Sequence, residues 1–372
     1  MSHINIVLND FQNDSRVWKI SNSLQRIGFT TRVVALHGKG LPVLENKQGV
    51  DVERIQLLSR TWPKWSPIQL LKYVEFVAKV VWRYRAVDAV HCNDLNALPL
   101  GILIKLLGRK VKVVYDCHEY ETEINGLKGL EKIAKRWLER WLIRYADAVL
   151  TVSDSIAREY SRLYAMPKPH LILNCPSYVD QVKQNLFRER FGIRSDQLIF
   201  LYQGGLSKGR GIEILLNAFA KRQNDRCVLV CMGYGPLEPE VKMFAKHSAV
   251  IFYHPAVDQK VLLNYTSSAD CGVLFYEDTC LNHKYCSPNK IFEYLMAGIP
   301  VLTSNLFEMR RLVEAESVGL VAESNDLQGF MQALDRALSL NIEEMRKNVQ
   351  CARQRYCWEE QEKVLRDVYA KL

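Results

Sequence analysis

Short apolar runs rich in β-branched residues alternate with longer amphipathic segments along the whole chain. The runs that read as strands are 4–8, 30–36, 88–92, 112–119, 146–153, 170–174, 198–205, 227–233, 249–255, 270–276, 298–304 and 319–323. Helical apolar spacing marks the segments around 17–27, 98–107, 130–145, 154–164 and 341–372. This alternation predicts an α/β fold, in which doubly wound parallel sheets carry helices on both faces.

The pattern relaxes around Pro176–Asn185 and then restarts, and 372 residues exceed what one ordinary core accommodates. We therefore expect two Rossmann-like domains at 1–178 and 179–355, followed by a terminal helix at 356–372 that packs back on the first domain. Because open α/β sheets bind ligands at the carboxyl ends of their strands, we expect a ligand cleft between two facing domains.

Composition disfavours several classes of protein. The opening residues read as a strand and a loop rather than a signal peptide, and no run of about 18 apolar residues is free of charges. The ten cysteines form no CxxC pair. We therefore expect reduced, mostly buried thiols, a cytoplasmic location and no zinc site.

Net charge is concentrated in the first half. The chain carries +9, of which residues 1–180, with 26 basic and 18 acidic side chains, contribute +8. Such a surplus indicates either nucleic acid or an anionic membrane as partner. No nucleic-acid motif is found, whereas 61–86 and 128–146 interleave aromatic and basic residues as interfacial helices do. The alternative is that these are ordinary amphipathic helices facing the core.

The segment 202–219 breaks a buried strand with a glycine-rich loop and then begins a helix. Its glycines let the backbone approach a ligand closely, and the helix N-terminus with two cations favours a phosphate. The residues concerned are Gly204, Gly205, Lys208, Arg210 and Gly211. The alternative is an ordinary loop with solvated basic side chains.

The segment 284–302 contains a second candidate site. Ser287, Pro288 and Asn289 predict a helix start with a capping side chain, and Lys290 near that start favours a diphosphate. Glu293 lies one turn further along the same side of the predicted helix, where a carboxylate can accept hydrogen bonds from both hydroxyls of a ribose. The alternative is a simple cap followed by a solvated glutamate.

The order and spacing of these and other motifs resemble glycosyltransferase family 4, retaining enzymes of the GT-B fold that use nucleotide sugars. The similar segments are DSRV at 14–17, YDCHE at 115–119, 147–160, 208–219, CMGYGP at 231–236, 289–301 and 356–369. The resemblance implies that Arg210 and the N–H groups of Asn289 and Lys290 bind the donor diphosphate. It also implies that Glu293 holds the donor ribose, that Gly233 and Gly235 line a nucleobase pocket, and that His118 faces the transferred sugar.

Three positions depart from the family pattern. Tyr285 replaces the first glutamate of the E-x7-E motif, and Pro288 replaces the glycine of the phosphate loop. Gly204-Gly205 stands where many members have Gly-Arg, so we expect Lys208 or Lys290 to supply the missing cation. We interpret the chain as a variant enzyme rather than an inactive one.

Residues of the first domain are candidates for the cleft. Asp14 and Arg16 in the first loop could contact acceptor or donor phosphate, or serve as an N-cap and a first-turn residue. His118 follows a strand end, where functional groups of such sheets gather. Glu119 could pair with His118 or cap a helix.

The hypothesis is a glycosyltransferase that moves a hexosyl or N-acetylhexosaminyl unit from a nucleotide sugar to a glycan or lipid-linked acceptor with retention, in cell-surface glycan synthesis. His118, Arg210 and Lys290 are its expected catalytic residues, and no metal or other cofactor is expected because cations offset the leaving-group charge. A nucleotide-sugar epimerase of the same fold and a non-catalytic nucleotide-sugar-binding partner remain alternatives. A dehydrogenase is disfavoured because no glycine follows the first strand.

Overall fold

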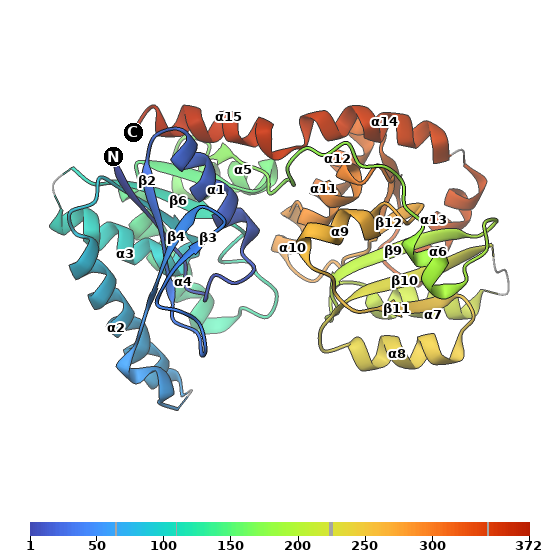
Figure 1. Cartoon of the computed structure of the whole chain (residues 1–372), viewed down its shortest axis with the longest axis horizontal. Helices are drawn as coiled ribbons and strands as arrows, with labels where there is room; N and C mark the ends of the chain where they lie inside the picture. Colours follow the sequence, from blue (N-terminus) through green and yellow to red (C-terminus); the bar gives the residue numbers. More distant parts are fainter. Residues whose placement is uncertain (64, 109, 223–225, 341) are drawn as a thin grey trace. The chain divides into compact units, whose positions relative to one another are not determined.

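A computed structural model describes residues 1–63, 65–108, 110–222, 226–340 and 342–372. Two compact units make up the described chain: Met1–Ile172 with Glu362–Leu372, and Leu173–Gln361. Figure 1 colours them along the sequence. The chain passes from the first unit to the second between Ile172 and Leu173, slightly upstream of the predicted boundary at 178–179. Residues 64 and 341, which belong to the predicted stretches 61–86 and 341–372, lie outside the described residues.

The first unit contains a sheet that is parallel except for one hairpin. Its order among the described residues is β3-β4-β2-β1-β5-β6-β7-β8, and only β3 and β4 pair antiparallel. The strands are β1 (Ser2–Ile6), β2 (Thr30–Leu36), β3 (Leu44–Lys47), β4 (Val50–Ile55), β5 (Ala89–Asn93), β6 (Lys112–Cys117), β7 (Ala148–Thr151) and β8 (His170–Leu171). The parallel sheet confirms the predicted fold class, whereas the β3–β4 hairpin was not predicted.

The helices of the first unit lie between its strands in the sequence, and most of them pack on this sheet. They are α1 (Ser15–Arg26), α2 (Ser66–Tyr84), α3 (Asp94–Leu107), α4 (Gly129–Leu142) and α5 (Asp154–Tyr164), with short 3-10 turns η1 (Leu58–Thr61) and η2 (Ile143–Tyr145). Helix α1 packs on β2 and β4, and α3 packs on β5 and β6 as well as on α2. The connecting helices thus cover the sheet as a doubly wound fold requires.

The second unit contains a wholly parallel sheet of order β11-β10-β9-β12-β13-β14 among the described residues. The strands are β9 (Leu198–Gly205), β10 (Cys227–Tyr234), β11 (Ile251–His254), β12 (Cys271–Leu274), β13 (Val301–Thr303) and β14 (Gly319–Val321). They are almost entirely buried and apolar, as expected for a parallel sheet that is covered on both faces.

The second unit's helices divide between the two faces of its sheet. They are α6 (Leu186–Phe191), α7 (Ile212–Lys221), α8 (Glu238–His247), α9 (Gln259–Thr266), α10 (Leu281–Tyr285), α11 (Asn289–Met296), α12 (Phe307–Glu316), α13 (Leu327–Ser339) and α14 (Ile342–Arg355), before α15 (Trp358–Tyr369). Buried side chains of α7, α8 and α13 form one core with the strands, and α11 packs against α9 and α14. The predicted helical segment 341–372 thus contains α14 and, as the predicted terminal helix at 356–372, α15.

Each sheet has one point at which the strand order reverses. The reversal falls between β1 and β5 in the first sheet and between β9 and β12 in the second. Loops that leave neighbouring strands in opposite directions open a crevice at such a point, where ligands of α/β sheets bind. The loops after β9 and β12, and those after β1 and β5, are consequently the places where functional side chains should lie.

Gly272 in β12 tests the packing of the second sheet. A Cβ at this position would lie 2.3 Å from Cγ of the buried Tyr294 ring, whereas a Cβ at Gly205 meets nothing within 4 Å. Gly272→Ala is expected to lower the free energy of unfolding of this unit by about 1–3 kcal/mol through overpacking. Chemical denaturation measures the loss, Gly205→Ala is the matched control, and equal stability of the two variants would contradict this packing.

Candidate active site

The loop after β9 is built around a close contact between backbone and side chain. Gly204 has φ of +110°, and a Cβ there would lie 2.5 Å from Cε of Lys290. A larger residue here would displace the end of the lysine side chain, and glycine also suits the positive φ. Gly204 and Lys290 belong to separate sequence motifs, and this contact brings the two motifs together.

The two glycines after β10 have an equally tight environment. A Cβ at Gly233 would lie 1.9 Å from the carbonyl oxygen of Gly204, and one at Gly235 would lie 2.4 Å from that of Leu206. Gly235 also has φ of +149°. The CMGYGP turn thus packs directly on the loop after β9, which explains both glycines by packing.

Lys290, in the first turn of α11, carries a buried amine that forms no ion pair among the described residues. Its Nζ donates to the Tyr202 hydroxyl at 3.0 Å and lies 4.3 Å from the centre of that ring. Among the described residues, no carboxylate lies within ion-pair distance of this amine. Burial, and then the charge of Arg210, lower the pKa of Lys290 to about 7. Pro288 occupies the N-cap position, and no side chain caps the helix, in contrast to the predicted cap.

Arg210 approaches the same place from the glycine-rich loop. Its Nη1 donates to the Tyr276 hydroxyl at 2.9 Å, and the Lys290 amine lies 5.7 Å from the Tyr276 ring centre. Tyr276 is buried just after β12. Lys208, two residues before Arg210, is exposed. Two basic side chains therefore lie close to one aromatic ring at the reversal point of the sheet.

Glu293 is held by a residue that the sequence did not single out. Gln203 donates through Nε2 to Oε2 of Glu293 at 2.5 Å, and its Oε1 accepts from the Thr266 hydroxyl at 2.8 Å. Asn289 is exposed at the start of α11. The ring of Tyr285 packs edge-on against Phe307, with centroids 6.3 Å apart.

In the first unit, a buried ion pair underlies the candidate residues. Arg16 donates from Nε and Nη2 to the two carboxylate oxygens of Asp116, at 2.9 and 2.7 Å, and from Nη1 to the carbonyl of Ile172. Arg16 is 3% exposed. The structure therefore favours an internal role for Arg16, and Asp14 serves as the N-cap of α1 by accepting from the Val17 N–H.

His118 lies among acidic side chains at the carboxyl end of β6. Its Nδ1 is 3.5 Å from Asp94, its Nε2 is 3.4 Å from Asp116 and 3.1 Å from the Asn93 amide oxygen. Burial opposes the charged ring, but Asp94 and Asp116 outweigh it and raise the pKa of His118 to about 9. His118 is consequently a cation at neutral pH, and Glu119 beside it is exposed.

Several residues around these sites were missed from the sequence. They are Tyr202, Gln203 and Tyr276 in the second unit, and His91, Asn93, Asp94 and Asp116 in the first. Asp116 could have been identified from the sequence, because it lies two residues before His118 and residues i and i+2 of a strand point to the same face. The others are brought in by neighbouring strands or lack any local pattern.

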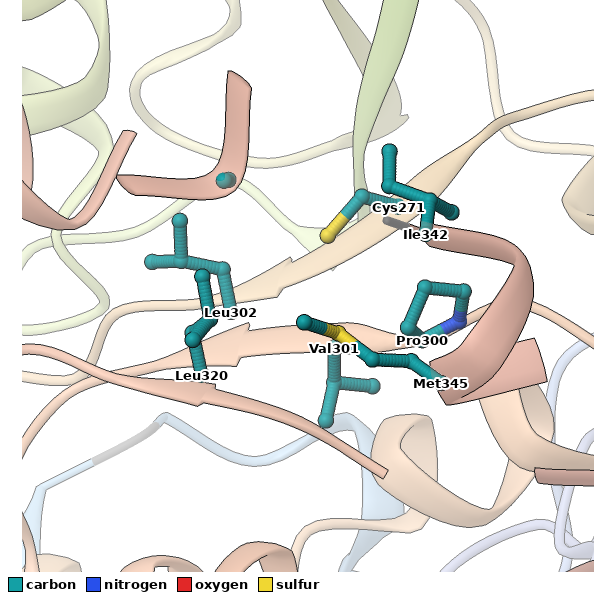
Figure 2. A pocket seen from close by; sticks show the side chains of 8 residues that line it. Cys271, Pro300, Val301, Leu302, Leu320, Ile342 and Met345 are labelled. Carbon is teal, nitrogen blue, oxygen red and sulfur yellow. The ribbon is translucent and has the colours of Figure 1, made fainter. Parts of the chain in front are cut away.

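A small cavity elsewhere in the second unit is not a ligand site. It offers only about 10 Å³ and has an apolar lining that includes Cys271, Leu302, Ile342 and Met345, as Figure 2 shows. This volume is near the minimum for a single water molecule. Among the described residues, no group of three or more His, Cys, Asp or Glu side chains is arranged to hold a metal ion.

Comparison with protein families gives two matches. Residues 14–175 match the family model described as glycosyl transferase 4-like domain, and residues 197–339 match the one described as glycosyl transferases group 1. An uncharacterized glycosyltransferase of Methanocaldococcus jannaschii is 25% identical over 342 residues, which are 86% of this chain and 83% of that protein. Matches to two further glycosyltransferases span 58% and 56% of their lengths.

Solved structures with the same fold cover the whole chain. Sucrose-phosphate synthase from Thermosynechococcus elongatus superposes with a TM-score of 0.82 at 17% identity, covering 100% of this chain and 98% of its own. HepE from Anabaena, in complex with UDP and glucose, has a TM-score of 0.76 at 15% identity and full coverage of both chains. At these identities the likeness shows a shared two-domain α/β fold.

Lys290→Met tests the buried amine. A lysine whose pKa is lowered on folding destabilises the folded state at low pH, and this cost is relieved as pH rises from about 7 towards 10.5. Between pH 6 and 9, the free energy of unfolding of the wild type should therefore rise by about 1–3 kcal/mol relative to that of the variant. Denaturation at several pH values measures the gap, with the exposed Lys208→Met as control. A gap that stays constant with pH would contradict the burial argument.

Proposed function

Because this chain belongs to the GT-B glycosyltransferases that join a 4-like domain to a group 1 domain, we propose that it transfers a hexosyl or N-acetylhexosaminyl unit from a nucleotide diphosphate sugar to a glycan or lipid-linked acceptor, with retention. The observation that carries the proposal is the buried Lys290 amine, which donates to the Tyr202 hydroxyl, forms no ion pair among the described residues and lies against the backbone of Gly204. A buried cation of this kind is stabilised by an anionic ligand.

The donor would bind with its diphosphate between the glycine-rich loop and the start of α11. Lys290, Arg210 and the exposed Lys208 supply positive charge there, and the first N–H groups of α11 at Asn289 and Lys290 are available as donors. The same groups would stabilise the charge that develops on the leaving diphosphate, so we propose that the reaction needs no metal or other cofactor. HepE, which shares the fold, was solved with UDP-glucose.

The remaining parts of the donor would be held by neighbouring residues. Glu293, which accepts a hydrogen bond from Gln203, would accept hydrogen bonds from the hydroxyls of the ribose, and the turn at Gly233 and Gly235 would lie against the nucleobase. The hydroxyl of Tyr285 cannot accept hydrogen bonds through two oxygens as a carboxylate does. Its contacts to the sugar ring would therefore differ from those of a glutamate at this position.

In the first unit, we propose that the charged His118 contacts the transferred sugar or its leaving oxygen. The imidazolium is held from two sides by Asp94 and Asp116, so its orientation is set before any ligand binds. Preorganised charge of this kind favours the transition state without further rearrangement. Asp94, which is half-buried, and the exposed Glu119 would contact an acceptor hydroxyl.

Donor binding can be measured directly. UDP-, GDP-, ADP- and CMP-sugars are titrated calorimetrically, and one of these classes is expected to bind. Arg210→Ala should weaken that binding at least about tenfold, because a charge-assisted contact is lost. Glu293→Ala should weaken nucleotide sugars but not inorganic diphosphate. Lys221→Ala, at the far end of α7, is the charge-matched control.

Two results would overturn the donor site. One is that no nucleotide sugar binds, and the other is that Arg210→Ala and Glu293→Ala bind like the control. Turnover of the donor into an isomeric nucleotide sugar without acceptor would identify an epimerase instead. Binding without any turnover over a panel of glycan and lipid-linked acceptors would favour a non-catalytic partner.

We also propose that the first unit attaches peripherally to an anionic membrane, at the inner face in a cell. The apolar side chains of α4 are exposed rather than turned into the core: Leu130, Ile133, Trp137, Leu138 and Trp141 are 42–84% exposed. Basic residues flank them, although Lys132 and Arg136 already pair with Glu123. Within the described part of the chain, no helix has the length and apolarity needed to cross a bilayer. An interfacial helix is the arrangement that uses this exposed face.

Attachment can be tested by sedimentation with vesicles of phosphatidylglycerol and phosphatidylcholine. The wild type should sediment with anionic vesicles at low salt and be released at high salt, because each basic residue near the surface contributes about 1 kcal/mol. Trp137→Ser with Trp141→Ser should reduce the bound fraction several-fold. Met243→Ser with Val261→Ser, which removes exposed apolar groups of the second unit, is the control. Absence of binding at low salt would refute the attachment.

A further inference from the structure

Tyr369, close to the end of the chain on α15, lies in the core of the first unit. Its hydroxyl is 3.1 Å from Nε2 of His3 and 2.8 Å from Nδ1 of His91. The ring packs edge-on against Phe29, with centroids 5.4 Å apart, and parallel to His91. Tyr369 is 5% exposed, and both histidines are almost fully buried. A hydroxyl between two imidazoles in a dry core must have a defined donor direction.

The direction follows from the partner of His91 on its other side. Nε2 of His91 lies 3.2 Å from Oδ2 of Asp116, and a carboxylate only accepts, so Nε2 carries the proton. Burial lowers the pKa of His91 despite this carboxylate, so the ring is neutral and its Nδ1 accepts. The Tyr369 hydroxyl therefore donates to His91, and its oxygen accepts from Nε2–H of His3.

A further observation agrees with this assignment. Nδ1 of His3 is buried without a hydrogen-bond partner among the described residues. With the proton on Nε2, this atom is a bare lone pair rather than an unsatisfied N–H, which is the less costly of the two in an apolar core. Burial, and then the proximity of His91, also lower the pKa of His3 far below its usual value, so that ring is neutral too. Every donor thus points one way, from His3 through Tyr369 and His91 to Asp116.

Asp116 is the carboxylate that also holds His118. Its Oδ2 accepts from Arg16 and His91 and lies 3.4 Å from Nε2 of His118. We propose that Tyr369 is a positioning residue for His118, acting from the C-terminal helix through His91 and Asp116. The inference rests on the proposed function only in giving His118 a role at the substrate.

The expected effect of removing the hydroxyl has a definite sign. Donation to Nδ1 polarises His91 and makes its Nε2–H a stronger donor to Asp116. Without it, Asp116 keeps more of its negative charge for the histidine on its other side. The other charged groups that face His118, namely Asp94 and Arg16, are unchanged. Tyr369→Phe should therefore raise the pKa of His118 above its value of about 9.

Nuclear magnetic resonance of the full chain with ¹⁵N-labelled histidine tests this. His118→Gln and His91→Gln assign the two signals. In the wild type, His91 should be neutral with its proton on Nε2. In Tyr369→Phe, the Nδ1 signal of His91 should shift to that of an unbonded nitrogen, and the pKa of His118 should rise by about half a unit. Phe29→Leu, which loosens the packing of the same ring but keeps the hydroxyl, should lower the melting temperature and leave both signals unchanged.

Three outcomes would overturn the proposal. One is a wild-type His91 protonated on Nδ1, which reverses the donor direction and needs no variant to be seen. Another is an unchanged His118 titration in Tyr369→Phe with lowered stability, which assigns Tyr369 to packing alone. The last is a shift of equal size in Phe29→Leu. These readouts need no substrate, so failure of the donor titrations is a separate result.

Discussion

The bidentate pair between Arg16 and Asp116 is the interaction on which the first unit's site depends. It joins the first turn of α1 to the end of β6, and the third donor of Arg16 reaches the carbonyl of Ile172 at the edge of the unit. Burial alone would raise the pKa of Asp116, but Arg16 and then His118 outweigh it and hold that pKa well below its usual range. A buried charge of this kind is tolerated only with full hydrogen bonding, and His91 and His118 complete it.

The second unit buries a basic side chain, whereas the first buries a carboxylate. There the buried group is the amine of Lys290, which bonds to an aromatic hydroxyl; burial lowers its pKa, and the nearby Arg210 lowers it more than the nearby Glu293 raises it. Gly233 and Gly235 let the CMGYGP turn approach the loop after β9 at distances that a Cβ would not permit, and Lys290 lies against Gly204. One unit thus carries a neutralised cluster that orients a histidine, and the other carries positive charge that favours an anionic ligand.

Much of the fold could be predicted from the sequence because parallel strands are short, apolar and bounded by loops. β9 and α5 have the bounds that the pattern indicated, and the two-domain α/β class is confirmed. The β3–β4 hairpin was missed because its strands are short and largely polar, so they lack a continuous apolar run. The predicted division at 355–356 between the second domain and a terminal helix agrees with the break between α14 and α15, where Cys357 and Trp358 are buried.

The sequence by itself determined which chemical groups each half contributes: glycines, Lys208, Arg210, Lys290 and Glu293 in one, and His118 in the other. Motif spacing suffices for this, since helix starts and strand ends are local features. Only the tertiary structure decided how the groups are paired. Arg16 meets Asp116, Gln203 meets Glu293, and Tyr369 meets His3 and His91 across separations of many residues. No local pattern records such contacts, because they follow from the order in which parallel strands lie side by side in the sheet.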